Sequence, residues 1–244
     1  MPVKYDNIAE QYKVGEKAIA KEYVTKSTFL KLCGNLKGKS VLDLACGSGY
    51  STRLLKQLEA KDVVGIDASE RQIDLAKEEE NRTCLVIKYV VGDVFTYDFS
   101  QLGSFDVATA LFLLHYSSTK EQLAKMCKQI YTSLKRGGRF VSLNDIPKVS
   151  FSDKKYEVTI TSEGLLKEGS RLKVTYYSKG KEICSFYTYY WKRETYETAL
   201  KNAGFRNIKW HKPIISEEGI KMFGKEFWKE CLEKPTIVGI ECIK

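Results

Sequence analysis

Two acidic residues and two glycines stand at spacings that suit the binding of a nucleoside cofactor. Residues 41–49 (VLDLACGSG) contain Asp43, Gly47 and Gly49, and Asp67 follows 18 residues after Gly49. A glycine turn that opens a helix is where dinucleotide-binding folds hold a pyrophosphate. That motif needs a further glycine or alanine three residues on, where this chain has Thr52. Asp43 would also direct a carboxylate toward the turn, and a carboxylate repels pyrophosphate but suits a cationic ligand.

S-adenosylmethionine (SAM) is the nucleoside cofactor that carries an ammonium and a sulfonium group. Asp67 ends the second expected strand, where an acidic side chain can bind both hydroxyls of a ribose. The glycine turn and this second acid together predict a SAM site, with S-adenosylhomocysteine as the product.

Strands and helices must alternate around this turn to position it. Apolar runs predict five strands at residues 40–45, 62–67, 86–91, 105–114 and 139–145, and helical spacing predicts helices at 50–58, 69–80 and 120–134. Ser69 is the expected N-cap of the second helix, with Gln72 three residues on. Two later strands begin at residues 208 and 236. This alternation predicts an α/β protein with a Rossmann-like, doubly wound, seven-stranded and mostly parallel sheet.

The remaining segments are expected to cover that core within a single domain of residues 1–244. Residues 1–36 predict N-terminal lid helices, 37–147 the SAM-binding core, and 193–244 the C-terminal part of the core. Residues 148–192 predict an antiparallel hairpin insertion after strand five, with strands at 172–177 and 183–191. Its aromatic residues would suit stacking on a flat acceptor, although such a stripe is more often core.

The chain resembles the small-molecule type of class I SAM-dependent methyltransferases over nearly its whole length. The family's acid-x-Gly-x-Gly-x-Gly turn is matched by Asp43, Ala45, Gly47 and Gly49, with Ala45 in place of the first glycine. The opening residues 5–12 are similar to the family's lid, and the segment through Phe227, Trp228 and Pro235 is similar to toxoflavin-synthase-like methyltransferases, which act on nitrogen heterocycles. The resemblance implies cofactor contacts from Tyr12, Asp43, Ala45, Gly47, Gly49, Asp67, Ala68, Gln72, Asp93, Val94 and Leu111.

Methyl transfer from a sulfonium is an in-line displacement, so the protein supplies alignment, exclusion of water and in some cases a base. His115 lies just past the fourth strand and is the expected base or substrate-orienting residue, with Tyr116 beside it. The chain lacks the sequence motifs of base-amine, arginine and cysteine-nucleophile RNA methyltransferases. A small-molecule acceptor methylated on nitrogen or oxygen is therefore the expected substrate, and a nitrogen heterocycle is one form of it.

Composition leaves two alternatives open. The net charge of +9 would suit an RNA or tRNA methyltransferase, and an intact cofactor motif would also fit a non-catalytic SAM-binding regulatory subunit. The basic residues are scattered, so a nucleic acid is the less favoured partner. No metal site is expected. The sequence contains no apparent membrane span or signal peptide, which predicts a cytoplasmic location, and a monomer or homodimer is expected. The seven cysteines are expected to be reduced thiols, with Cys84 and Cys127 in the core.

Overall fold

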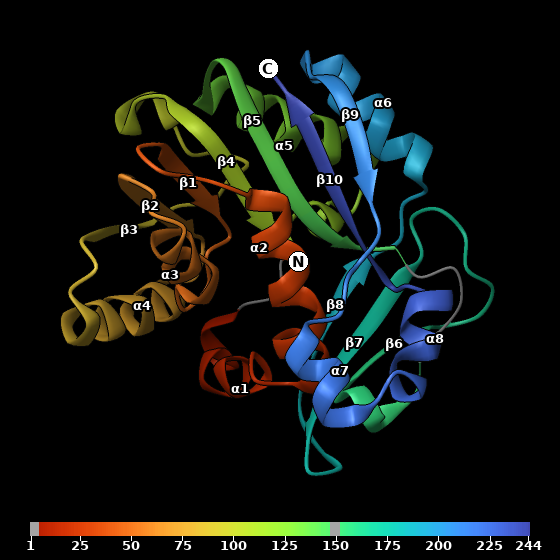
Figure 1. Cartoon of the computed structure of the whole chain (residues 1–244). Coiled ribbons are helices and arrows are strands. Elements are labelled where there is room, and N and C mark those ends of the chain that lie inside the picture. The colour runs from red at the N-terminus through yellow and green to blue at the C-terminus, as the bar shows by residue number, and fades with distance from the viewer. Residues whose placement is uncertain (1–4, 147–151) are drawn as a thin grey trace.

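A seven-stranded sheet forms the centre of the molecule (Figure 1). The computed structural model describes residues 5–146 and 152–244. The strand order is β3-β2-β1-β4-β5-β10-β9. The strands are β1 (Ser40–Leu44), β2 (Asp62–Asp67), β3 (Ile87–Val91), β4 (Phe105–Leu111), β5 (Leu134–Asp145), β9 (Arg206–His211) and β10 (Ile237–Ile243).

Five of these strands pair in parallel, and β10 runs in the opposite direction between β5 and β9. β1 pairs with β2 and β4 in parallel, and β2 with β3 and β4 with β5 do the same. β10 runs antiparallel to both β5 and β9. The prediction of a Rossmann-like, doubly wound and mostly parallel sheet is therefore confirmed.

Helices cover both faces of the sheet because β-strand side chains alternate between the faces. Val41 packs into a cluster with α2, α3 and α4, whereas its neighbour Leu42 packs into a cluster with α5 and α6. Both leucine and valine are completely buried. The covering helices are α2 (Lys26–Cys33), α3 (Tyr50–Gln57), α4 (Glu70–Thr83), α5 (Lys120–Ser133) and α6 (Arg193–Ala203).

A second, antiparallel sheet lies beyond the carboxyl ends of the parallel strands (Figure 1). It contains β6 (Val158–Ser162), β7 (Arg171–Ser178) and β8 (Lys181–Tyr189). The expected hairpin is thus present and β6 adds a third strand, because the residues of β6 pair with β7 in full register. The first residues of the 148–192 insertion, 148–151, lie outside the described residues.

The two chain ends complete this region. The N-terminal helices η1 (Tyr5–Asn7) and α1 (Ala9–Gly15) precede the π-helical turn η2 (Lys21–Thr25), and α1 packs on β7 and β8. Near the C-terminus, α7 (Glu217–Phe223) and α8 (Lys229–Glu233) flank η6 (Glu226–Trp228), whose Trp228 joins the core of the small sheet. Segments far apart in sequence therefore meet at the carboxyl edge of the main sheet.

The cysteines do not all lie where the sequence suggests. Cys127 is fully buried as expected, but Cys84 is exposed. Cys84 caps the C-terminus of α4 with a left-handed backbone, so the chain turns away from the core at this point. No helix among the described residues has the length and apolarity needed to cross a membrane.

Candidate active site

The turn after β1 has the left-handed backbone that its sequence predicts. The φ angles are +53° at Ala45, +54° at Gly47 and +79° at Gly49. A Cβ built on Gly47 would lie without a clash at 3.8 Å from Gln72 Oε1 and 3.9 Å from Glu16 Oε1, whereas a Cβ on Gly49 would lie 2.4 Å from the Tyr89 hydroxyl. The missing side chain at Gly47 thus leaves space for a ligand, and the missing side chain at Gly49 leaves space for the Tyr89 hydroxyl.

Asp43 lies beneath this turn and is completely buried. Its carboxylate accepts hydrogen bonds from the hydroxyls of Ser51 (2.8 Å), Thr52 (2.7 Å) and Thr109 (2.7 Å). Burial raises the pKa of Asp43, and the three hydroxyls oppose that shift. Asp43 therefore ties β1 to β4 and to the start of α3, and it supports the turn from below.

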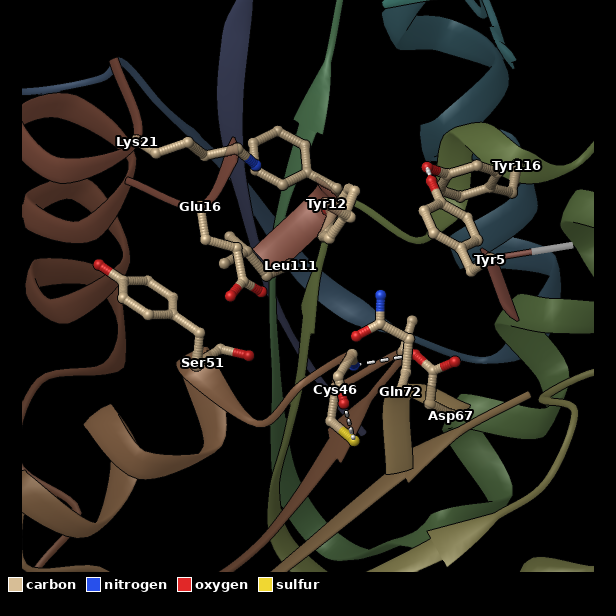
Figure 2. Close-up of a pocket in the computed structure, with 14 residues that line it drawn as sticks. Tyr5, Tyr12, Glu16, Lys21, Cys46, Ser51, Asp67, Gln72, Leu111 and Tyr116 are labelled. Atoms are coloured by element: carbon tan, nitrogen blue, oxygen red, sulfur yellow. Dashed lines mark hydrogen bonds between the residues drawn. The ribbon is translucent and has the colours of Figure 1, made fainter. Parts of the chain in front are cut away.

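Asp67 holds the turn from the end of β2. Its carboxylate accepts hydrogen bonds from the backbone amides of Gly47 and Ser69, each at 2.9 Å. The predicted cap is confirmed, because the Ser69 hydroxyl accepts from the backbone amide of Gln72 at 3.2 Å. The side-chain oxygen and nitrogen of Gln72 are buried without a hydrogen-bond partner among the described residues. Figure 2 shows Gln72 and Asp67 side by side in the pocket.

Gly47, Asp67 and Gln72 line the first cavity, whose empty volume, counted with the open solvent at its mouth, is about 610 Å³. The lining residues are Tyr5, Tyr12, Glu16, Lys21, Ala45, Cys46, Gly47, Tyr50, Ser51, Asp67, Gln72, Leu111, Phe112 and Tyr116.

Seven of the residues expected at the site share this cavity, namely Tyr12, Ala45, Gly47, Asp67, Gln72, Leu111 and Tyr116. The other expected cofactor contacts, Asp43, Gly49, Ala68, Asp93 and Val94, do not line it. Asp93 is exposed after β3 and accepts a hydrogen bond from the backbone amide of Phe95 at 2.8 Å, and Val94 is buried in the main core. The contacts assigned to these five residues remain predictions.

Glu16 is a lining residue that the sequence motifs did not indicate. Its carboxylate accepts a hydrogen bond from the Ser48 hydroxyl at 2.9 Å, and Figure 2 shows it directed into the pocket. Loss of water around this group raises the pKa of Glu16 to about 7. A carboxylate in an N-terminal helical segment has no distinguishing pattern, so only the packing of that segment over the turn reveals its position.

The N-terminal segment is fixed over the first cavity by further polar contacts. The Tyr5 hydroxyl bonds to the Tyr116 hydroxyl, and Arg71 on α4 pairs with Glu10. The Ser69 hydroxyl donates to Asp6 at 2.6 Å. These contacts place the expected lid on the open side of the glycine turn.

A second cavity, with about 590 Å³ of empty volume, adjoins the first. Its walls are mostly apolar or aromatic and come from the N-terminal helices, the small sheet and the C-terminal segment. The lining residues are Tyr12, Ala20, Lys21, Val24, Thr25, Phe112, His115, Asp145, Tyr156, Val158, Ile160, Val174, Tyr176, Phe186, Cys231, Thr236 and Ile237. Of the hairpin aromatics, Tyr176 and Phe186 face this space, whereas Trp191 is in the main core and donates to the Ser117 carbonyl oxygen at 2.9 Å.

Tyr12, Lys21 and Phe112 line both cavities and therefore mark their junction. Lys21 opens the π-helical turn η2 and is 8% exposed, with its ammonium 3.5 Å from the centre of the Phe112 ring. π-Helical turns are rare and occur often at functional sites. Phe112 has a φ of +66°, a conformation that costs a non-glycine residue about 1–3 kcal/mol. The backbone is thus irregular on both sides of the junction.

His115 and Asp145 form the polar end of the second cavity. The imidazole Nδ1 of His115 accepts a hydrogen bond from the backbone amide of Asp145 at 3.1 Å. Burial and the nearby Lys21 charge lower the pKa of His115 to about 3, so its ring is neutral and Nε2 carries the proton. Nε2 has no hydrogen-bond partner among the described residues. Of the two roles expected for His115, this geometry allows substrate orientation and leaves no lone pair for a base.

Comparison with known proteins agrees with this geometry. Residues 41–138 match the family model described as a methyltransferase domain. An uncharacterized protein of Haemophilus influenzae is 26% identical over 91% of this chain and 88% of its own length. The ubiquinone biosynthesis O-methyltransferase of Nitrosococcus oceani is 34% identical over 49% of this chain, and the aligned region spans 50% of that relative. Residues 41–138 are a SAM-dependent methyltransferase domain.

A solved structure of a SAM-dependent methyltransferase from Mesorhizobium loti has the same fold as this methyltransferase. The TM-score is 0.66 at 19% identity, and the match covers 94% of this chain and all of that one. At this identity the likeness concerns the fold alone.

The first cavity fits SAM, the cofactor of this methyltransferase domain. Gly47 lines the cavity without a side chain, Asp67 offers carboxylate oxygens at the end of β2, and the buried amide of Gln72 lacks a hydrogen-bond partner among the described residues. The ribose would be held at Asp67, and the carboxylate of Glu16 suits the ammonium group of the cofactor. Among the described residues, no cluster of three or more His, Cys, Asp or Glu side chains could hold a metal ion.

Proposed function

We propose that this methyltransferase transfers the methyl group of SAM to the nitrogen or oxygen of a small molecule bound in the second cavity. The observation that carries the proposal is the junction at Tyr12, Lys21 and Phe112, where the two cavities share walls. An in-line displacement requires the acceptor atom and the methyl group to approach each other, and neighbouring cavities provide that alignment.

The residues of this chain supply alignment and exclusion of water. When bound, SAM supplies a methyl group activated on a sulfonium. Tyr5 and Tyr116 close the first cavity through their hydroxyl contact, and Tyr12 packs against both Tyr176 and Phe186 at ring-centre distances of 5.7 Å. This aromatic wall keeps solvent from the junction and presents flat, apolar surfaces to an acceptor.

The second cavity fits a small acceptor better than it fits RNA. Cationic side chains gather instead around another cavity, where Lys39, Lys135, Arg136 and Arg139 lie near the amino ends of β1, β4 and β5. The glycine turn and both proposed ligand cavities lie at the opposite, carboxyl edge of the sheet. An RNA methyltransferase would need its basic surface beside the cofactor, since the phosphates of RNA dominate its affinity.

The name of the Nitrosococcus oceani relative, a ubiquinone biosynthesis O-methyltransferase, supports a small acceptor. The nitrogen-heterocycle acceptor, the cytoplasmic location and the monomeric or dimeric state remain predictions from the sequence.

The test combines binding with a turnover screen on one preparation. Calorimetry would measure the binding of SAM and S-adenosylhomocysteine, and methyl transfer would be followed with phenols, carboxylic acids, heteroaromatic amines and bulk RNA. We expect binding of both nucleosides and turnover on a small acceptor. Turnover on RNA alone would contradict the proposal, and binding without any turnover would favour a regulatory SAM-binding subunit.

A further inference from the structure

The polar groups of the second cavity stand at one end of an otherwise apolar space. Among the lining residues that the structure describes, Lys21 interacts electrostatically with His115 and Asp145. The other ionisable groups are Tyr12, Tyr156, Tyr176 and Cys231, whose pKa values burial raises, so they are neutral near pH 7. A buried polar group costs free energy unless a partner satisfies it. A ligand that fills this cavity should therefore be apolar over most of its surface and polar at one end.

The hydrogen-bond donors in the cavity determine which polar group of the ligand fits there. The Lys21 ammonium can only donate hydrogen bonds, and the neutral His115 ring offers an Nε2–H group that has no partner. Two donors in the wall of one cavity suit an oxygen, and the positive charge on Lys21 favours an oxygen that is negatively charged. The same charge opposes an amine acceptor, because methylation of an amine places a positive charge on nitrogen.

Asp145 provides a proton acceptor, whereas Lys21 and His115 provide hydrogen-bond donors. Its side chain is 8% exposed and its carboxylate lies 3.7 Å from His115 Nδ1, at the same end of the cavity. Burial raises the pKa of the Asp145 carboxyl above its ordinary range, and the charge of Lys21 partly offsets this shift. A carboxylate with a raised pKa accepts a proton near neutral pH more readily than an exposed one does.

We infer that the acceptor is a planar, largely apolar molecule with an acidic oxygen, which Lys21 and His115 hold as its anion while Asp145 takes the proton. This inference rests on the proposed function. The acceptor O–H bond breaks and its proton passes to the Asp145 carboxylate. The oxygen then forms a bond to the methyl carbon, the carbon–sulfur bond breaks, and its electron pair stays on sulfur in S-adenosylhomocysteine. A carboxylic acid that arrives ionised needs no proton transfer.

Charge balance supports this assignment. Before transfer, the Lys21 ammonium faces the Asp145 carboxylate, which raises the pKa of Lys21 against the larger effect of its burial. Once Asp145 is protonated, the ammonium has the acceptor anion as its counterion. With a hydroxyl acceptor, the cavity therefore holds one positive and one negative charge until the methyl group is transferred, and Asp145 must then release its proton to restore the pair.

The experiment compares ligands that share one ring system and differ in one group. Calorimetry on the full chain saturated with S-adenosylhomocysteine would measure the binding of 2-naphthol, 2-naphthoate and 2-aminonaphthalene. We expect at least one of the two oxygen ligands to bind at least tenfold more tightly than the amine, and which of them does so separates a hydroxyl from a carboxyl acceptor. Lys21→Met should remove this preference, whereas Lys17→Met, at an exposed position on the same segment, should preserve it.

A turnover assay separates failure of this inference from failure of the proposed function. With 6-amino-2-naphthol and SAM, the O-methyl product should dominate. Equal or tighter binding of the amine, or a dominant N-methyl product, would overturn the inference and leave the proposed function standing. If no small ring compound binds or reacts while RNA is methylated, both fail. The wild-type ligand comparison decides the question even if Lys21→Met does not fold.

Discussion

The two cavities differ in how far apart in the sequence their walls are. The polar floor of the first cavity comes from the turn after β1, the end of β2 and the start of α4, which together span residues 45–72. The second cavity draws on the N-terminal helices, the ends of β4 and β5, the small sheet and the C-terminal segment, from residue 12 to residue 237. Local sequence thus determines the polar floor of the cofactor site. The tertiary fold adds the N-terminal residues and residues 111–116 to that site, and it assembles the whole acceptor site.

The two cavities also use charge differently. The first contains carboxylates, from Asp67 and Glu16, which suit hydroxyl and ammonium groups of a ligand. The second contains donors from Lys21 and His115 together with Asp145. Substitutions of residues that line only one cavity should therefore change the binding of one ligand and spare the other.

The largest expected effect is that of Asp67→Ala. Removal of this carboxylate takes away the proposed ribose contacts and the acceptor for the Gly47 amide. Loss of a buried, charged hydrogen-bond partner costs about 1–3 kcal/mol, or roughly five- to 150-fold in affinity. Calorimetry should show this loss for S-adenosylhomocysteine.

Asp98→Ala serves as the control, because Asp98 caps a short helix at the surface and lines neither cavity. A dissociation constant of Asp67→Ala equal to that of the wild type would remove Asp67 from the site. An equal loss of 2-naphthol affinity in Asp67→Ala would contradict the separate roles of the two cavities.

Gly47→Ala should have the next largest effect, at about tenfold weaker S-adenosylhomocysteine binding. The new methyl group would occupy the first cavity, and the φ of +54° adds strain of about 1–2 kcal/mol. Gly34→Ala isolates the strain, since Gly34 has a φ of +60° with no atom near a Cβ. Both variants should unfold at lower denaturant concentration, but only Gly47→Ala should lose affinity. Equal affinities would show that the cofactor does not pass this glycine.

Glu16→Gln should weaken S-adenosylhomocysteine by about fivefold, the cost of a partly exposed charged contact of about 1 kcal/mol. 5′-Methylthioadenosine lacks the amino acid group, so its affinity should not change. Glu22→Gln, on the same segment but outside both cavities, is the control.

The raised pKa of Glu16 predicts the direction in which the affinity for S-adenosylhomocysteine changes with pH. The pKa of Glu16 is raised to about 7, so the carboxylate becomes charged as the pH rises through that value. Wild-type affinity for S-adenosylhomocysteine should therefore rise between pH 6 and pH 8, and that of Glu16→Gln should rise less. Parallel pH profiles of the two proteins would contradict an ammonium contact at Glu16.

Ala45→Gly should have the smallest effect. Ala45 has a φ of +53°, and glycine adopts this conformation without strain but loses more entropy on folding. We expect a gain of less than about 1 kcal/mol in the free energy of unfolding, measured by urea titration, with unchanged nucleoside affinity. A loss of stability would show that the Ala45 methyl group makes packing contacts that outweigh the strain.

The difference between the two cavities also explains which features could be predicted from the sequence. The strand alternation and the cap at Ser69 follow from local patterns, and the structure confirms both. Gly47 and Asp67 line the first cavity because short segments position them. The spacing of Asp43 from the glycines is typical of a cofactor contact. In the structure, however, hydroxyls from α3 and β4 surround its carboxylate, and no local sequence pattern predicts those contacts.

Glu16 and Lys21 were not predicted because their segment carries no motif. They reach the cavities only because the N-terminal helices pack across the sheet edge, where α1 contacts β7 and β8. Phe112 also lacks a sequence signal, since a left-handed φ at phenylalanine is contrary to its preference and the surrounding fold imposes it.

A crystal structure of the full chain with S-adenosylhomocysteine would show directly where the nucleoside binds. We expect the ribose hydroxyls at Asp67, the ammonium at Glu16, and the sulfur facing the junction of Lys21 and Phe112. A nucleoside bound elsewhere, or a sulfur atom directed away from the second cavity, would contradict this arrangement.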